Sequence, residues 1–380
     1  MARVWCIFLA SCVLVAFSVP AMPAEPPEAD VPSVIKAEPA ADCNARFAGK
    51  EGWIGGDCVY SVALGPKRTL WLFGDTLMGT VKDGRRPGAV MVNNTIAIQV
   101  GQGKDAAMRF LTGKARDDKP TAFFIPADGK GWFWVKAALQ VGERLYIFLP
   151  QIEKTKDPGV FGFQQIAQWL AVVDNPADEP EKWHVKQLKL PFGEFGPDRE
   201  RSWGSAMLAE GDYLYVYGCD EERGKGIGKR RLTVARVPAD KLDDPTAWRF
   251  RSATGWSEKA TDAMPLADGL ATEFSVSRVP GQKGYVAVYT ENGLGARIVG
   301  RFASAPEGPW SAPVLLYTCP EMAKDKGLFS YAAKAHSWAA TGDELVVSYC
   351  VNSWEFARLF RDEEVYRPKF VRVQLGPGKR

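Results

Sequence analysis

Residues 53–76 read Trp-Ile-Gly-Gly-Asp-Cys-Val-Tyr-Ser-Val-Ala-Leu-Gly-Pro-Lys-Arg-Thr-Leu-Trp-Leu-Phe-Gly-Asp-Thr. This stretch is typical of a β-hairpin, because two apolar runs, 59–64 and 70–73, flank the turn residues Gly-Pro-Lys. If the turn is centred on Pro66, residues equidistant from it pair, which places Asp57 opposite Asp75. Opposed residues on antiparallel strands have Cβ atoms roughly 4.5–5.5 Å apart. The hairpin therefore predicts two facing carboxylates, whereas a slip of one residue would separate them.

The hairpin pattern recurs along the chain. Its second strand begins near residues 70, 145, 214, 285 and 345, and further strand-like segments follow most copies. Four strands per unit and five units predict an all-β fold, a five-bladed β-propeller over residues 45–376. A long β-sandwich is the alternative, but the regular intervals favour blades.

Equidistant pairing in the later hairpins places Asp220 opposite Ser202, Glu273 opposite Glu291 and Asn352 opposite Ala332. These positions, like Asp57 and Asp75, fall at the same end of each hairpin and so predict a polar ring around one mouth of the channel. Polar residues also gather at strand ends because loops begin there. Crowded carboxylates, however, shift one another's pKa values apart, as an acid and base pair requires.

Aromatic residues at the same end could stack on sugar rings, although each on its own is also a normal core residue. With Asp57 and Asp75 as the catalytic pair, the residues predicted to bind substrate are Asn93, Asn94, Trp132, Trp203, Asp220, Glu273, Glu291, Tyr331, His336 and Asn352.

The composition excludes several classes of protein. The 380 residues are 46% hydrophobic with a net charge of +3, which gives no electrostatic basis for binding nucleic acid. Only two histidines are present and no Cys-x-x-Cys occurs, so we expect neither a metal site nor a cofactor.

The N-terminus is typical of an export signal. An apolar run follows Arg3, and Ala21 fits the cleavage pattern, with Ala24 as an alternative. Residues 1–21 are therefore predicted to be a signal peptide and 22–44 a flexible linker. Lipoprotein anchoring at Cys12 fits less well, because the apolar run continues past it. We expect an exported monomer, periplasmic or extracellular, with no membrane segment after cleavage.

Five cysteines remain after the signal peptide, which permits two disulfide bonds in an oxidising compartment. The pairs closest in sequence, Cys43–Cys58 and Cys319–Cys350, are the expected bridges.

The segments Gly55-Gly56-Asp57, residues 70–76 and Met91-Val92-Asn93-Asn94 resemble the signature of domain-of-unknown-function family 4185. The resemblance extends through Glu273 and residues 331–336. It implies a five-bladed propeller and, from some members, an endo-D-arabinofuranosidase of glycoside hydrolase family 183. The catalytic aspartates of that family would correspond to Asp57 and Asp75.

Three functions follow from these observations. The first is a secreted glycoside hydrolase acting on a polysaccharide, in which one aspartate protonates the leaving oxygen and the other acts as nucleophile or base. The second is a non-catalytic carbohydrate-binding propeller, and the third a structural or protein-binding propeller. A serine hydrolase is disfavoured because neither histidine lies near a nucleophile motif.

Overall fold

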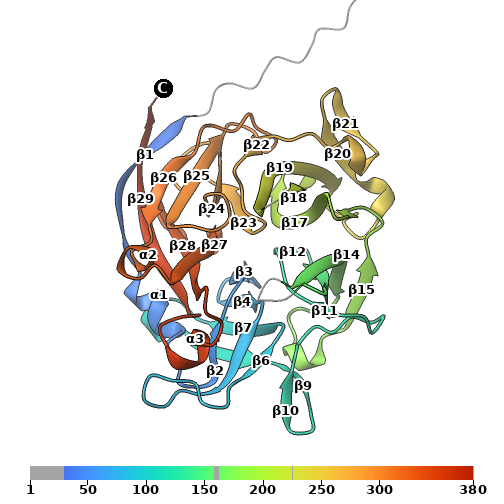
Figure 1. Cartoon of the computed structure of the whole chain (residues 1–380). Helices are drawn as coiled ribbons and strands as arrows, with labels where there is room; N and C mark the ends of the chain where they lie inside the picture. Colours follow the sequence, from blue (N-terminus) through green and yellow to red (C-terminus); the bar gives the residue numbers. More distant parts are fainter. Residues whose placement is uncertain (1–29, 158–161, 225, 380) are drawn as a thin grey trace, which may run out of the picture.

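The computed structural model describes residues 30–157, 162–224 and 226–379, which form a five-bladed β-propeller (Figure 1). The predicted signal peptide and Cys12 lie outside the described residues. The strand repeat was read correctly: the second strands of the blades begin at Arg68, Arg144, Tyr213, Tyr285 and Glu344.

Each blade is an antiparallel sheet whose first strand lies at the axis. Blade 1 comprises β3 (Tyr60–Ala63), β4 (Arg68–Phe73), β7 (Thr95–Val100) and β8 (Ala107–Leu111); blade 2 comprises β12 (Ala138–Val141), β13 (Arg144–Lys154), β14 (Phe163–Val173) and β15 (Val185–Lys189), with β11 (Trp132–Phe133) beside β13. Blade 3 comprises β17 (Arg199–Glu210), β18 (Tyr213–Gly224), β19 (Gly226–Pro238) and β20 (Arg249–Ser252), with β16 (Glu194–Phe195), β21 (Gly255–Ser257) and β22 (Ala267–Asp268) added at its edges.

Blade 4 comprises β23 (Phe274–Arg278), β24 (Tyr285–Thr290), β25 (Arg297–Ala303) and β26 (Val314–Thr318), and blade 5 comprises β27 (Leu328–Ala335), β28 (Glu344–Ser353), β29 (Pro368–Lys379) and β1 (Val31–Pro39). Outside the blades lie the sheet β2 (Glu51–Gly56), β5 (Thr76–Thr80) and β6 (Val90–Val92), the hairpin β9 (Gly113–Arg116) and β10 (Lys119–Thr121), and the helices α1 (Ala41–Arg46), α2 (Glu321–Lys324) and α3 (Arg358–Arg361).

The ring is closed by the N-terminal segment, which corrects the linker prediction for residues 31–44. β1 pairs antiparallel with β29, so the start of the described chain supplies the outermost strand of the last blade. The composition was misleading because an uncovered β29 edge is a strong template for pairing, whatever the intrinsic preference of the segment that covers it.

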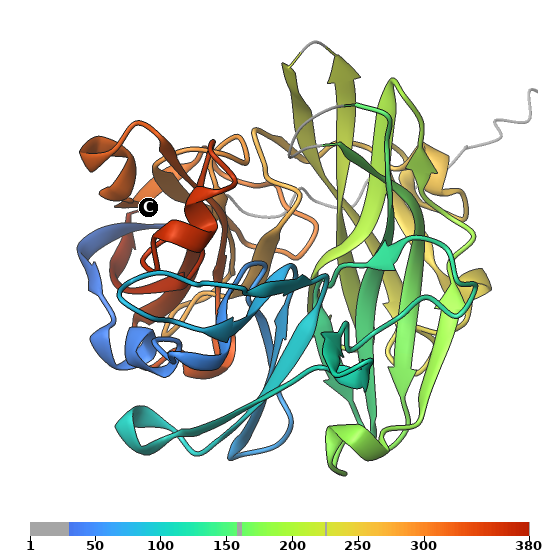
Figure 2. The ribbon, with the colours of Figure 1, turned by 60° about the horizontal axis from the view of Figure 1, so that its bottom comes forward.

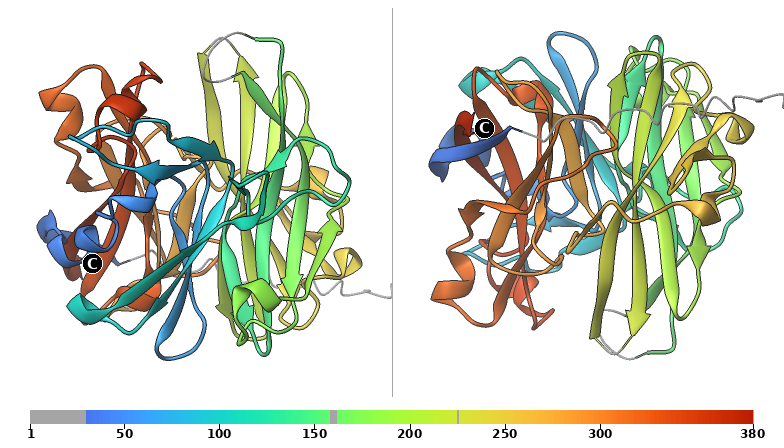
Figure 3. Two further views of the ribbon diagram at one scale, coloured as in Figure 1. Left: turned by 90° about the horizontal axis from the view of Figure 1, so that it is seen from below. Right: turned by 90° about the horizontal axis from the view of Figure 1, so that it is seen from above.

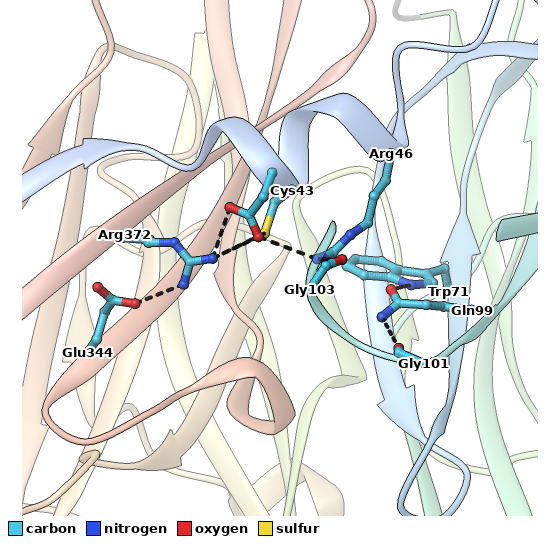
Figure 4. A network of polar contacts seen from close by, with 9 residues as sticks. Cys43, Arg46, Trp71, Gln99, Gly101, Gly103, Glu344 and Arg372 are labelled. Atoms are coloured by element: carbon cyan, nitrogen blue, oxygen red, sulfur yellow. Dashed lines mark hydrogen bonds and ion pairs between the residues drawn. The ribbon is translucent and has the colours of Figure 1, made fainter. Parts of the chain in front are cut away.

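A polar network fixes this closure (Figure 4). Arg372 on β29 contacts Glu344 of β28 at 2.8 Å and Asp42 of α1 at 2.9 Å. From the same helix, Arg46 donates to the Gly103 carbonyl at 2.9 Å, in the connection between β7 and β8 of blade 1. Helix α1 therefore joins the fifth blade to the first.

All five cysteines of the described chain are free and buried, so both disulfide predictions are wrong. Cys43 lies beside Arg372 in the closure network, whereas the Cys58 thiol contacts the Val135 carbonyl of blade 2 at 3.4 Å. The members of the predicted pair therefore pack in different surroundings, which proximity in sequence could not reveal.

Blades 2 and 3 are taller than the others. Their long strands, coloured green to yellow, project past the ring on one side (Figure 2), and the views from below and above show them as a wall opposite blade 5 (Figure 3). Within the described ranges, no helix has the length and apolar character needed to cross a membrane.

Candidate active site

A cavity of about 400 Å³ lies at one end of the central channel. All five blades and the segment after α3 contribute to its walls. Its polar lining includes Asp57, Asp75, Lys136, Glu200, Glu221, Arg223, Arg230, Glu273, Tyr331, Asn352 and Tyr366, and its aromatic lining includes Trp134, Phe163, Phe329 and Phe356.

The first hairpin has the predicted register. Tyr60 pairs with Leu72 and Val62 with Leu70, each pair equidistant from Pro66. Past the end of the ladder, the Asp57 amide donates to the Asp75 carbonyl at 3.2 Å, and the Gly74 amide donates to the Asp57 carbonyl at 3.1 Å. The two aspartates therefore face each other at the cavity.

The backbone around Asp57 is strained. Cys58, Val59, Ala332 and Tyr366 all have φ between 57° and 67°, a left-handed conformation that costs on the order of 1–3 kcal/mol for such residues. The other non-glycine residues of the described chain with positive φ are Asp or Asn, which tolerate it. Unfavourable backbone is thus concentrated beside one carboxylate, a pattern typical of functional sites.

Asp57 is held by two phenols. Its Oδ2 accepts hydrogen bonds from the hydroxyls of Tyr331 at 2.7 Å and Tyr366 at 3.0 Å. Burial raises the pKa of Asp57 to about 8, and the negative charges of Asp75 and Glu273 add to the shift. Its carboxyl group therefore carries a proton at neutral pH.

Asp75 is held differently. Its Oδ1 accepts hydrogen bonds from the Trp134 indole at 2.9 Å and from the Asn93 amide at 3.3 Å. Burial raises its pKa to about 6, while these two donors oppose the rise. The pair thus divides into a protonated and an ionised member near pH 7. Among the described side chains, none donates a hydrogen bond to Asp57 Oδ1 or Asp75 Oδ2.

Two buried lysines lie below the acids. Lys334 forms an ion pair with Glu273 at 3.5 Å and lies over the Tyr60 ring at 4.4 Å. Lys136 donates to the hydroxyls of Ser202 at 2.9 Å and Ser205 at 3.3 Å, and burial lowers its pKa. Lys334 thus pairs with one of the acids that line the cavity, and Lys136 lines the cavity itself.

Five of the predicted residues line the cavity together: Asp57, Asp75, Glu273, Tyr331 and Asn352. Asn93 reaches the site through its hydrogen bond to Asp75. Its neighbour Asn94 does not, because its side chain is buried and bonded to the backbone of Phe124 and Phe133, where it fixes a loop.

The two predicted tryptophans and the predicted histidine do not line this cavity. Trp203 is fully buried in the core between blades, and Trp132 is half-buried against Trp134 rather than lining the cavity. His336 lines a different cavity, of about 410 Å³, on the other side of Lys334. His336 lies two residues after Lys334, directly past the end of β27.

The later hairpins depart from equidistant pairing. A bulge between Trp203 and Ala206 places Asp220 opposite Arg201, and Asp220 is fully buried in ion pairs with Arg199, Arg201 and Arg231. It is therefore a structural residue.

In blade 4, Phe274 pairs with Tyr289, one residue away from the expected register, so Glu273 and Glu291 are not opposed. Glu291 instead forms a surface ion pair with Arg297 at 2.6 Å. In blade 5, a bulge between Tyr331 and Lys334 places Asn352 opposite Phe329.

Trp134 and Tyr366, whose side chains hold the two aspartates, were not among the residues predicted from the sequence. Trp134 had a usable signal, because strand periodicity places it on the same face as Trp132. Tyr366 had none, since it lies between α3 and β29 in a segment without periodicity. Across the described ranges, no group of three or more His, Cys, Asp or Glu side chains could hold a metal ion.

The chain belongs to the family described as "Domain of unknown function (DUF5005)", whose model matches residues 41–375. The resemblance to family 4185 is therefore wrong. The residues that carried it lie on or directly beside β2, β4, β5 and β6, and these strand segments identify the fold better than the family.

Among curated proteins, the chain is 28% identical over 154 residues to "Notoamide biosynthesis cluster protein J'" of Aspergillus versicolor. This match spans 39% of each protein. Among solved structures, a protein from Bacteroides ovatus described as a "putative hydrolase" has a TM-score of 0.70 and 18% identity, covering 89% of this chain and 90% of the other.

A GH43_1 enzyme from Xanthomonas citri, solved with xylose, has a TM-score of 0.45 and 16% identity, covering 89% of this chain and 93% of the other. At 18% identity, the comparison with the Bacteroides ovatus protein shows the fold alone.

Proposed function

We propose that this protein is a glycoside hydrolase in which Asp57 protonates the leaving oxygen and Asp75 acts as base or nucleophile. One observation carries the proposal: two facing aspartates in one cavity have raised pKa values, of about 8 and about 6. A protonated and an ionised carboxyl group together are what cleavage of a glycosidic bond requires.

The cavity suits a sugar. Trp134, Tyr331 and Phe356 line the cavity, and the C–H face of a sugar could stack on such aromatic rings. Asn352, Glu221 and Arg230 provide donors and acceptors for hydroxyl groups. The free oxygen of each aspartate is available to a ligand, because the phenols, the indole and Asn93 occupy only the other oxygen.

The proposal does not extend to arabinofuranose, since that expectation rested on the resemblance to family 4185. Export remains part of the proposal, because an apolar run follows Arg3 and Ala21 fits the cleavage pattern of a signal peptide. The N-terminus of the mature protein, determined by mass spectrometry, tests export: retention of residues 1–21 would contradict it.

The direct test is a screen of the purified protein against neutral furanose and pyranose polysaccharides, with reducing ends measured. We expect new reducing ends from at least one polysaccharide with the wild type and none with Asp57→Asn. Binding without cleavage would replace the hydrolase by the carbohydrate-binding alternative, and cleavage by Asp57→Asn at the wild-type rate would remove Asp57 from the chemistry.

A further inference from the structure

Of the described aromatic side chains, only Trp354 and Phe356 are classed as exposed, at 53% and 44%. They lie two residues apart in the segment between β28 and α3, and Phe356 lines the cavity mouth. Large apolar side chains that gather in the open at a cavity rim commonly mark a binding surface.

A row of rings connects this segment to the proposed acid. The hydroxyl of Tyr331 bonds to Asp57, and its ring lies 5.6 Å from that of Phe329. Phe329 in turn lies 4.4 Å from Trp354, with an interplanar angle of 38°. Phe329 itself is only 4% exposed. The exposed indole is therefore the outer end of a row of packed rings that begins at the carboxylate.

The segment is held in place before any ligand arrives. The Trp354 amide donates to the Gly327 carbonyl at 3.0 Å, and the Ser353 hydroxyl donates to the same carbonyl at 3.2 Å. Ser353 Oγ also accepts from the Glu355 amide at 3.1 Å. A surface fixed in this way loses little conformational entropy on binding.

The opposite wall is charged but internally paired. On the tall strands of blade 3, Arg223 pairs with Glu200, and Arg230 pairs with Glu221 at 3.0 Å. This wall offers many hydrogen-bonding atoms and no unpaired charge among its four residues, which suits a neutral polyhydroxylated ligand better than an ionic one.

We propose that Trp354 and Phe356 form a stacking subsite for a further sugar unit of a neutral glycan whose cleaved bond lies at Asp57 and Asp75, with the buried Phe329 ring packed behind the Trp354 indole. This inference rests on the proposed function and sharpens it: the substrate is an uncharged oligosaccharide or polysaccharide long enough to extend from the carboxylates to the rim. The occupant is a sugar because Phe356, and the Phe329 ring against which Trp354 packs, also line the cavity that holds the acid pair.

The test compares short and long ligands. Affinities of neutral disaccharides and hexasaccharides derived from xylan, arabinan and galactan are measured by calorimetry, with Asp75→Asn preventing turnover. For a hexasaccharide that binds, Trp354→Ala should weaken affinity about tenfold, whereas the matching disaccharide should bind unchanged. Trp354→Phe should retain most of the affinity, and Val100→Ala, equally exposed at 55%, should have no effect.

Trp354 also provides an optical readout, because no other described tryptophan is exposed. The hexasaccharide should protect tryptophan fluorescence from iodide quenching in the wild type but not in Trp354→Ala. Equal losses for both ligand lengths, or no loss, would overturn the subsite. Concentration-dependent self-association that disappears in Trp354→Ala would assign this surface to a second copy and also overturn it.

The outcomes separate the two proposals. Cleavage that is insensitive to Trp354 would remove only the subsite. Length-dependent binding that requires Trp354, without any cleavage by the wild type, would remove only the hydrolase. A wild type that binds none of these ligands would contradict both.

Discussion

The two ends of the central channel hold cavities of nearly equal size, about 400 and 410 Å³. They differ in how completely the key polar side chains are hydrogen-bonded to one another. At the second end, the Trp338 indole donates to Ser61 at 2.7 Å, Ser61 contacts His336 Nδ1 at 2.6 Å, and His336 Nε2 contacts Ser348 at 2.8 Å. These groups satisfy one another, and burial lowers the pKa of His336 to about 3, so it is neutral.

At the first end, the two aspartates are only half satisfied, although the charged residues of the blade 3 wall pair with one another. Each aspartate has one oxygen held by the protein and one left over, and the backbone beside Asp57 is strained. A closed hydrogen-bonded chain stabilises the join between blades 1 and 5, whereas open acceptors with raised pKa values can act on a ligand. The completeness of hydrogen bonding therefore distinguishes a structural cluster from a functional site better than the types of residue in it do.

The largest effect on the rate of cleavage is expected from substitution of the two aspartates at the first end of the channel. Asp57→Asn and Asp75→Asn should each reduce glycan cleavage by ~10²–10⁴-fold, because general acid or base assistance is lost. Ser61→Ala, at the other end of the channel, should leave the rate unchanged. Rates are compared for variants whose circular dichroism matches the wild type, and a rate unaffected by both aspartate substitutions would contradict the assignment.

A smaller effect should follow from moving Asp57 without removing it. An alanine Cβ at Gly74 would lie 2.5 Å from Asp57 Oδ1 and 3.1 Å from the Cys58 thiol, so the carboxylate must shift. A displacement of this kind costs up to ~10²-fold in rate. Gly49→Ala is the matched control, since its Cβ would meet only an ordinary contact at 3.6 Å. Equal rates for both variants would show that the position of Asp57 is unimportant.

The same hairpin shows how far the sequence could lead. Pro66 centres a short turn without a bulge, so simple counting located Asp57 and Asp75 correctly. Counting failed at Asp220 and Asn352, because bulges near Ser205 and Ala332 shift the register of the inner strands. A bulge depends on tertiary packing and adds one residue to one strand, so periodicity alone does not reveal it.

The partners of the acids were harder still to foresee. Tyr366 reaches Asp57 from a segment pinned by Arg86, a fully buried guanidinium group that donates to the carbonyls of Leu359, Asp362, Glu363 and Val365. Nothing local in residues 358–366 encodes this contact with a loop some 280 positions earlier in the chain. The site can therefore be predicted only in part from the sequence, because the two aspartates flank a regular hairpin whereas most of the side chains that bind them lie on irregular loops.

The pH profile offers a third test. Cleavage requires ionised Asp75 and protonated Asp57, so kcat/KM should rise with pH through about 6 and fall again through about 8. The two limbs belong to the coupled pair rather than to either residue alone. A rate that rises steadily from pH 5 to 9 would contradict Asp57 as the acid.

A fourth test shifts the alkaline limb of the pH–rate profile. Tyr366→Phe removes a hydroxyl that donates to Asp57 and lowers its pKa. The pKa of Asp57 should therefore rise further, and the alkaline limb should move to higher pH with no more than about a tenfold change in maximal rate. Tyr217→Phe is the control, because its hydroxyl bonds to the remote Pro306 carbonyl. A shift to lower pH would contradict the hydrogen-bond assignment.

The smallest effect on catalysis is expected from His336→Gln, a substitution that tests whether the second end of the channel is structural only. The variant should keep the wild-type rate and pH profile, because His336 lies in the other cavity, yet lose about 1–3 kcal/mol of unfolding free energy through its disrupted partners. The pKa of His336 is lower in the folded protein than in the unfolded chain, so the unfolded chain binds more protons as the pH falls below about 6.5. The wild type should therefore lose stability between about pH 6.5 and 3, and the variant should lose less over the same range, as measured by urea denaturation at several pH values. A changed catalytic profile in His336→Gln would show that the second cavity takes part in the chemistry and would end the contrast between the two ends.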